Sequence, residues 1–141
     1  RRVEHPYLLP YPDAHFDAVV AAGVLEHVAF DYESLKELNR VLKPSARLII
    51  TYLPNRFSYQ EWRLRRSGSP AFHRRRHTIW SCTRLLRHAG FEPLRLGYQT
   101  QLDLLRANSK LNPRRNAMRS LGFRHLTSCL CAVAEKVEAF G

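Results

Sequence analysis

The chain has 141 residues, of which 45% are hydrophobic, and its formal net charge is +11. This size suffices for one domain with a hydrophobic core and is too small for two ordinary domains. The sequence contains no run of 18 apolar residues, which argues against a membrane-spanning helix. Arg1 and Arg2 are not followed by the apolar segment of a signal peptide, so we expect a cytoplasmic protein.

The positive charge is concentrated in the second half of the chain. Residues 1–54 hold six Lys and Arg against seven Asp and Glu, whereas residues 55–125 hold sixteen against three. Arginine predominates there, and its planar guanidinium suits carboxylate and phosphate groups. Two interpretations stay open: an ordinary solvated surface, or a site for an anionic partner.

A strand, a helix and a second strand are predicted in the first half. Residues 16–23 form an apolar run without polar alternation, typical of a strand that helices cover on both faces in the middle of a parallel sheet. A helix follows Asp31, which we expect to cap it. The apolar face of this helix consists of Leu35, Leu38, Val41 and Leu42. Residues 47–53 predict the second strand.

Two further helices are predicted next. Residues 55–66 indicate a short helix with Phe57, Tyr59 and Trp62 as its apolar anchors. Residues 79–89 indicate a helix that Thr78 caps and Gly90 ends, and its apolar face consists of Cys82, Leu85, Leu86 and Ala89.

The last two predicted strands are residues 91–98 and 126–137. Pro93 indicates an edge position or an irregular start for the first of them. Residues 99–125 form a variable basic connection with a short helix predicted at 116–121. Alternation of strands and helices predicts an α/β fold with helices packed on the sheet.

Two strings of sequence carry a family resemblance. Residues 9–28 (LPYPDAHFDAVVAAGVLEHV) and 35–55 (LKELNRVLKPSARLIITYLPN) resemble the C-terminal half of class I S-adenosylmethionine-dependent methyltransferases, especially the small-molecule branch called type 11. A looser likeness resumes at residues 77–92. The resemblance implies a Rossmann-like fold with a mostly parallel sheet and a final antiparallel strand. It also implies S-adenosylmethionine as the cofactor and methyl transfer to a small molecule as the activity.

The resemblance also implies where the site lies. Ligands of parallel α/β sheets bind at the carboxyl ends of the strands. Ala21, Ala22 and Gly23 are expected beside the cofactor, and Gly23 permits a close approach because it lacks a Cβ. His27 is the candidate catalytic residue, as a general base or a pocket-lining group, since imidazole titrates near neutrality. The other interpretation of His27 is packing at the start of the following helix.

The region over the site is expected to select the substrate. His73, Arg75 and His77 are the candidate substrate-binding residues, and they favour an anionic methyl acceptor. His73 and His77 have a spacing that metal ligands use on a helix. No carboxylate or third ligand is near them in the sequence, so no metal site is predicted.

Residues 1–141 are therefore predicted to be a partial methyltransferase domain. The family's glycine-rich cofactor turn has no counterpart, because the six glycines contain no GxG cluster. We expect a fragment that is inactive alone and that self-associates through an exposed sheet edge. The family's usual KPGG turn is Lys43-Pro44-Ser45-Ala46 here, which puts the geometry of that turn in question.

An alternative function is a noncatalytic basic module that binds nucleic acid or another polyanion through residues 55–125. Nucleic acid is the less favoured partner, because aromatic residues do not alternate with the arginines as a stacking platform requires. A nicotinamide-dependent oxidoreductase is disfavoured, since its phosphate-binding glycine fingerprint is absent.

Overall fold

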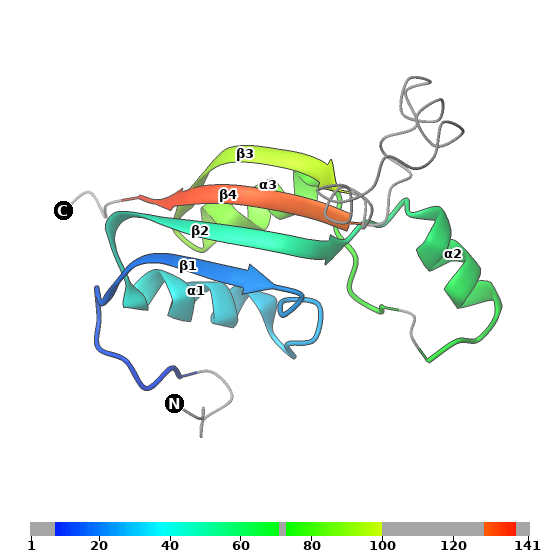
Figure 1. Cartoon of the computed structure of the whole chain (residues 1–141), viewed down its shortest axis with the longest axis horizontal. Coiled ribbons are helices and arrows are strands. Elements are labelled where there is room, and N and C mark those ends of the chain that lie inside the picture. The colour runs from blue at the N-terminus through cyan, green and yellow to red at the C-terminus, as the bar shows by residue number, and fades with distance from the viewer. Residues whose placement is uncertain (1–7, 71–72, 100–128, 138–141) are drawn as a thin grey trace, which may run out of the picture.

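The computed structural model describes residues 8–70, 73–99 and 129–137 (Figure 1). Four strands form one sheet in the order β1-β2-β4-β3. Strands β1 and β2 pair in parallel, whereas β4 is antiparallel to both of its neighbours. The strands are β1 (Phe16–Ala22), β2 (Leu42–Pro54), β3 (Phe91–Gln99) and β4 (Cys129–Lys136).

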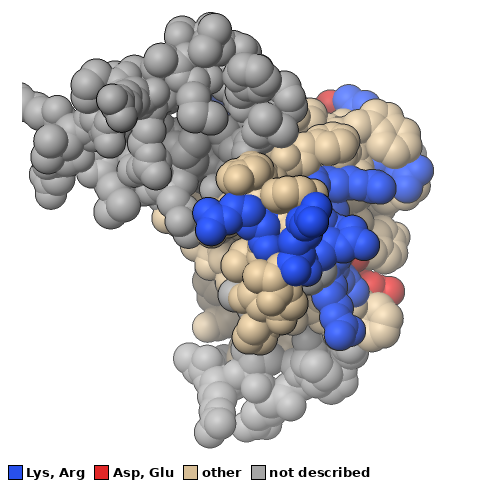
Figure 2. Space-filling view, turned by 90° about the vertical axis from the view of Figure 1, so that its right-hand side faces the viewer, with Lys and Arg blue, Asp and Glu red and all other residues tan. Residues whose placement is uncertain are grey.

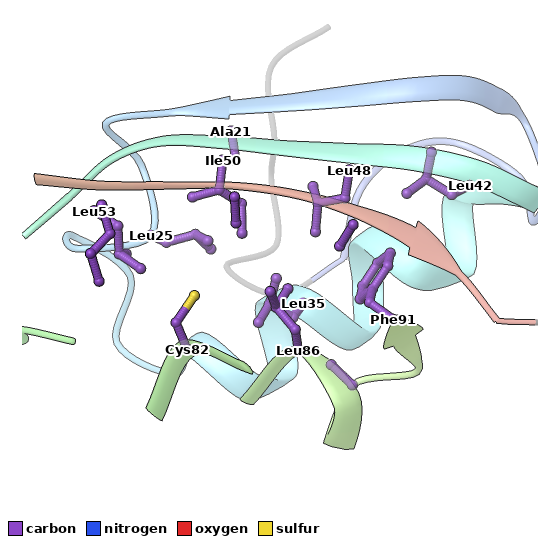
Figure 3. Close-up of a cluster of buried hydrophobic side chains, with 14 of the residues drawn as sticks. Ala21, Leu25, Leu35, Leu42, Leu48, Ile50, Leu53, Cys82, Leu86 and Phe91 are labelled. Carbon is purple, nitrogen blue, oxygen red and sulfur yellow. The ribbon is translucent and has the colours of Figure 1, made fainter. Parts of the chain in front are cut away.

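Two of the three described helices cover one face of this sheet. They are α1 (Asp31–Val41) and α3 (Ile79–His88), and both lie on the same side (Figures 1 and 3). The third helix, α2 (Tyr59–Arg66), stands beyond the carboxyl ends of β1 and β2 (Figure 1). In the part of the chain that the structure describes, none of these helices is long and apolar enough to cross a membrane.

The predicted α/β class and the final antiparallel strand are confirmed. Strands β1, β2 and β3 run in one direction and β4 runs against them, so the sheet is parallel only at the β1–β2 pair. Pro93 accompanies a register shift in β3, an edge strand of this sheet, as predicted. The basic connection at 99–125 and its helix at 116–121 lie, beyond Gln99, outside the described residues.

The prediction that residues 16–23 form a strand covered on both faces is wrong for the described structure. Strand β1 is an edge strand of the sheet, and its alternate residues Ala18, Val20 and Ala22 are exposed. Val20 is 62% exposed. The reason is that the described helices α1 and α3 pack on one face only, so a mostly apolar strand exposes its second face (Figure 1).

Apolar side chains between the sheet and the two helices form the core. Leu35 of α1 and Leu86 of α3 are both buried and meet Leu48 and Ile50 of β2 (Figure 3). Leu38 and Leu85 pack at the margin of the same cluster. The two apolar helix faces predicted from the sequence are thus the faces that the sheet covers.

The two helix starts differ from one another. Thr78 caps α3 as predicted, because its hydroxyl accepts a hydrogen bond from the Ser81 amide at 3.1 Å and Ser81 completes a capping box. Asp31 does not cap α1: the N-cap residue is Phe30, and Asp31 is the first residue of the helix. Its carboxylate instead accepts from the Tyr32 amide at 3.0 Å, so it remains near the positive end of the helix.

Gly90 ends the α3 turn in the left-handed region, with φ at +84°. A Cβ there would lie 3.0 Å from Nδ2 of Asn39, which donates to the Gly90 carbonyl at 2.8 Å. Glycine is therefore required for both the backbone angle and the close approach of α1.

A buried ion pair ties the first resemblance string to the second. The Glu37 side chain is 9% exposed and accepts from Arg40 Nη2 at 2.6 Å and from the Leu9 amide at 2.7 Å. Arg40 also donates to Asp13 at 2.6 Å and to the carbonyl of Tyr11 at 3.0 Å. These hydrogen bonds hold the pKa of Glu37 below its usual range. Glu37 and Arg40 thus hold the loop at residues 9–13 against helix α1.

The helix at residues 55–66 is confirmed in part, but its predicted anchors are wrong. Phe57, Tyr59 and Trp62 are each at least half exposed, whereas the polar residues Ser58 and Glu61 are buried. Ser58 caps α2 by accepting from the Glu61 amide at 3.3 Å. No residue of α2 belongs to the described core, because this helix projects past the end of the sheet (Figure 1).

Candidate active site

A cavity of about 250 Å³ opens at the carboxyl ends of β1 and β2, the edge at which ligands of α/β sheets bind. Helix α2 and the loop that follows it form its other wall (Figure 1). Both polar and apolar groups line it, and the lining residues are Gly23, Glu26, Tyr52, Pro54, Gln60, Glu61, His73 and Cys129.

Of the three residues expected beside the cofactor, only Gly23 lines this cavity. Its φ of +62° turns the chain out of β1, and its amide donates to the Thr51 carbonyl at 3.2 Å. Ala21 is buried in the core beneath the sheet, and Ala22 is exposed at the end of β1. The turn after β1 thus offers a glycine backbone rather than the two alanine side chains.

Glu26 and His27 follow in the same turn. The Glu26 side chain is only 6% exposed, and its Oε2 has no hydrogen-bond partner among the described residues. His27 is 68% exposed, and its Nε2 lies 3.9 Å from Glu26 Oε1. The helix-packing interpretation of His27 does not fit this exposure, because a packed histidine loses most of its contact with water.

His73 is held against the cavity by Glu61 of α2. The Glu61 side chain is 7% exposed, and its Oε1 lies 2.8 Å from His73 Nδ1. Its other oxygen accepts from the His73 amide at 3.2 Å. The ring of His73 also lies 5.7 Å from that of His27, between centroids. Tertiary folding therefore brings together two histidines that are 46 positions apart.

Arg75 and His77 face a different acid. Arg75 Nη1 lies 3.2 Å from Asp31 Oδ1, and the same guanidinium donates to the Ala29 carbonyl. His77 Nε2 lies 3.9 Å from Asp31 Oδ2. Burial lowers the pKa of His77, and the Asp31 carboxylate opposes that shift. These two residues fasten the loop to the start of α1, and neither lines the cavity.

Sequence reasoning missed Glu61, Tyr52 and Cys129. The spacing Ser58-x-x-Glu61 is a capping-box signature, which by itself indicates only a helix start. In the structure the Glu61 carboxylate contacts His73 instead. The burial of Glu61 is a property of the folded chain, and nothing in the sequence indicates it. Tyr52 and Cys129 come from β2 and β4, and nothing local in the sequence marks them.

Tyr52 has an unusual backbone for a bulky residue. Its φ is +63°, and the β2–β4 register shifts between Ile50 and Leu53. Left-handed backbone costs a non-glycine residue roughly 1–2 kcal/mol. Such strain concentrates at functional sites, and here it places Tyr52 on the cavity wall.

Cys129 is the thiol of the cavity. Burial, together with the nearby Glu26 and Glu61 carboxylates, raises its pKa to about 11. The thiol is therefore protonated near neutral pH and is a poor nucleophile there.

Arginines gather on the outer face around α2, and Figure 2 shows Lys and Arg crowded there. The last turn of α2 supplies Arg63, Arg65 and Arg66. Aromatic rings do lie among arginines: Arg66 stacks over Trp62 at 5.2 Å, and Arg84 over Trp80 at 4.8 Å. Helical spacing forms these two pairs within α2 and within α3, and whether they serve nucleic-acid binding stays a prediction.

The cavity suits one end of a cationic cofactor. Two buried carboxylates, Glu26 and Glu61, favour a positive group such as a sulfonium. Its volume is below the roughly 300–1,000 Å³ of drug-sized ligand sites, so it does not enclose a nucleoside and an acceptor together. The described residues thus fit part of S-adenosylmethionine.

The family model and the curated relatives that match this chain are both described as methyltransferases. Residues 2–50 match the family model described as a methyltransferase domain. The ubiquinone/menaquinone biosynthesis C-methyltransferase UbiE of Laribacter hongkongensis is 45% identical over 42 residues, which cover 30% of this chain and 17% of that protein. The chain therefore spans about a sixth of the length of this curated relative.

Solved structures share the fold. A SAM-dependent methyltransferase from Methanosarcina mazei superposes with a TM-score of 0.65 at 18% identity. The match covers 98% of this chain and 67% of the methyltransferase chain. The [4+2]-cyclase SpnF superposes with a TM-score of 0.62 at 21% identity, and the match covers 96% of this chain and 54% of the SpnF chain. At these identities the likeness shows the fold alone, and one of these two proteins is a cyclase.

Proposed function

We propose that this chain, whose residues 2–50 belong to the methyltransferase domain family and whose fold is that of S-adenosylmethionine-dependent methyltransferases, supports methyl transfer to a small molecule. One observation carries the proposal. In a chain of this family, a cavity lined by Gly23, Glu26 and His73 lies where the strands of the sheet end. Both the family and the fold imply S-adenosylmethionine as the cofactor.

S-adenosylmethionine, when bound, supplies a methyl carbon on a positively charged sulfur. Glu26 and Glu61 favour that charge from two sides of the cavity, and Gly23 allows a close approach of the backbone. His73, oriented by Glu61, holds the acceptor through its ring. Since methyl transfer depends mainly on alignment of the acceptor with the methyl carbon, these positioning roles supply most of the rate.

His27 is the proton acceptor in this scheme. Its exposed Nε2 is the atom that would take a proton from the acceptor as the new bond forms. Arg75 and His77 act indirectly, because they hold the loop that carries His73. An acceptor with a free negative charge would meet two carboxylates in this cavity, so the anionic acceptor expected from the sequence needs a compensating cation.

The test is transfer of labelled methyl from S-adenosylmethionine to a panel of phenols, carboxylates and thiols, in the longest translated product that contains these residues. Gly23→Ala is expected to lower transfer about tenfold or more, because it disturbs positioning at the cavity. Gly68→Ala is the matched control: Gly68 has a φ of +64° and no atom within 4 Å of an added Cβ, and it does not line the cavity. Equal losses in both variants would contradict the proposal.

The isolated 141 residues are expected to transfer methyl groups poorly, since the family's glycine-rich turn is absent from this sequence. Robust transfer by the purified chain would overturn that expectation. Self-association through the β1 edge is a further proposal, and sedimentation velocity over a concentration series tests it.

A second candidate function is binding of a polyanion by the arginines of α2. The Arg66–Trp62 and Arg84–Trp80 stacks favour it, because such pairs can engage bases and phosphates. Binding to duplex DNA that weakens steeply with salt, and that Arg63→Ala weakens, would support this function. Absence of binding at low salt would exclude it.

A further inference from the structure

Glu26, His27 and His73 each present a ligand atom, and these three atoms lie within 4.8 Å of one another. They come from the turn after β1 and from the loop after α2, two segments that meet only in the folded chain. From this cluster we propose a divalent transition-metal site of the two-histidine, one-carboxylate type at the mouth of the cavity. The pair predicted to have metal spacing, His73 and His77, is not the pair that meets.

Glu26 is the first independent reason to expect a cation. Its side chain is 94% buried, as its 6% exposure implies, and its Oε2 has no hydrogen-bond partner among the described residues. Its other oxygen, Oε1, lies 3.9 Å from His27 Nε2, which is beyond hydrogen-bond distance. A buried carboxylate without partners is costly, and a bound cation is one of the few groups that offset that cost.

The second reason is the support behind His73. Metal-binding histidines almost always engage a carboxylate or carbonyl through the ring nitrogen that does not bind the metal. Glu61 makes that contact to His73 Nδ1 at 2.8 Å, and Glu61 is itself buried. Since Nδ1 contacts Glu61, Nε2 is the His73 nitrogen that would bind a metal.

The donor set selects the metal. Two imidazoles and one carboxylate suit Zn²⁺, Co²⁺ or Fe²⁺, whereas Mg²⁺ and Ca²⁺ prefer oxygen donors throughout. Ligand atoms around tetrahedral zinc are roughly 3.4 Å apart, so ligand atoms that lie up to 4.8 Å apart need to approach by up to about 1.4 Å. The exposed His27 side chain can rotate to do so. Three protein ligands leave a coordination position open, as in catalytic metal sites.

The open position would face the cavity and therefore the methyl acceptor, a step that rests on the proposed function. The carboxylates of Glu26 and Glu61 repel an anionic acceptor, and a bound divalent cation would offset that repulsion. The acceptor class would then be an oxyanion, such as a phenolate or enolate, whose oxygen binds the metal. With a metal bound, Glu26, His27 and His73 are its ligands. The site therefore replaces three roles given above: Glu26 facing the sulfonium, His73 holding the acceptor and His27 taking the proton.

Metal binding is tested on the full chain after treatment with a chelator. Calorimetry with Zn²⁺ and visible absorption with Co²⁺ should both give one ion per chain. His27→Ala and His73→Ala should abolish the Co²⁺ band, and Glu61→Gln should weaken binding about 10- to 100-fold through loss of orientation. Circular dichroism of each variant checks that it is folded.

Two control variants test whether binding is specific to this cluster. His88→Ala and His15→Ala each remove an exposed histidine that does not line the cavity, and both should leave the stoichiometry and affinity unchanged. Absence of binding, binding that survives His73→Ala, or binding lost with either control variant would each overturn the proposal. Because the readout is metal binding, failure here leaves methyl transfer to be judged by its own assay.

Discussion

The molecule has two regions that are built in opposite ways. Between the sheet and helices α1 and α3 the buried side chains are apolar, and Glu37 is the one charged residue of these described elements that is buried. Around α2 and the loop to residue 77 the buried side chains are polar, among them Glu61 and His77, while Phe57 and Trp62 are exposed. The first region stabilises the fold, and the second holds chemical groups at its edge. A residue's effect should therefore depend on its region more than on its hydrophobicity.

The largest expected contrast is between Leu86→Ala and Trp62→Ala. Leu86 is fully buried, so its truncation should lower the free energy of unfolding by about 2–5 kcal/mol. Trp62 is larger but 50% exposed and outside the core, and its truncation should cost less than about 1 kcal/mol. Urea unfolding followed by circular dichroism measures both. A Trp62 variant as unstable as the Leu86 variant would remove the distinction between the regions.

The next contrast separates a buried ion pair from an exposed one. Arg40→Met leaves the Glu37 carboxylate buried without its main partner and should cost about 1–3 kcal/mol of unfolding free energy. Arg87→Met breaks the exposed pair with Glu92 and should leave the urea midpoint unchanged. Similar midpoints for the two variants would show that the loop at residues 9–13 is not held by Glu37 and Arg40.

The pH dependence of stability should report on His77, which joins the two regions. Its backbone bonds to Pro54 and Arg56, and its side chain faces Asp31. Because burial lowers its pKa in the folded state, the unfolded chain binds the proton more readily. Stability present above the unfolded pKa of about 6.5 should therefore be lost as pH falls through the lower folded pKa. His77→Gln should flatten this slope in thermal melts between pH 5 and 7, and an unchanged slope would contradict the assignment.

The smallest expected effect concerns the turn that begins β2. Ser45 stands where the related family commonly has glycine, and its φ is +57°, so the left-handed turn is retained with a strained residue. Ser45→Gly should raise stability by about 0.5–1 kcal/mol. Ala46→Gly is the adjacent control, and it should destabilise because Ala46 is buried and packs in the core. Thermal melts of the two variants should shift in opposite directions.

The amino-acid sequence by itself determined the elements of the first region. Helical spacing placed Leu35 and Leu86 on core-facing stripes, and capping chemistry placed Thr78 and Gly90 at helix ends. These features depend on residues within one or two turns of each other, so local patterns suffice. The resemblance strings then indicated the family, although the Glu37–Arg40 pair within them proved to be a structural tie.

Only the tertiary structure decided the composition of the site. Glu26, Glu61 and His73 lie in three separate segments, and their meeting depends on where α2 and its loop fold past the end of the sheet. The same packing sent Arg75 and His77 to Asp31, left one face of β1 open and exposed the aromatic residues of α2. Long-range contacts of this kind leave no periodic trace in the chain, because each partner's local neighbours are compatible with several arrangements.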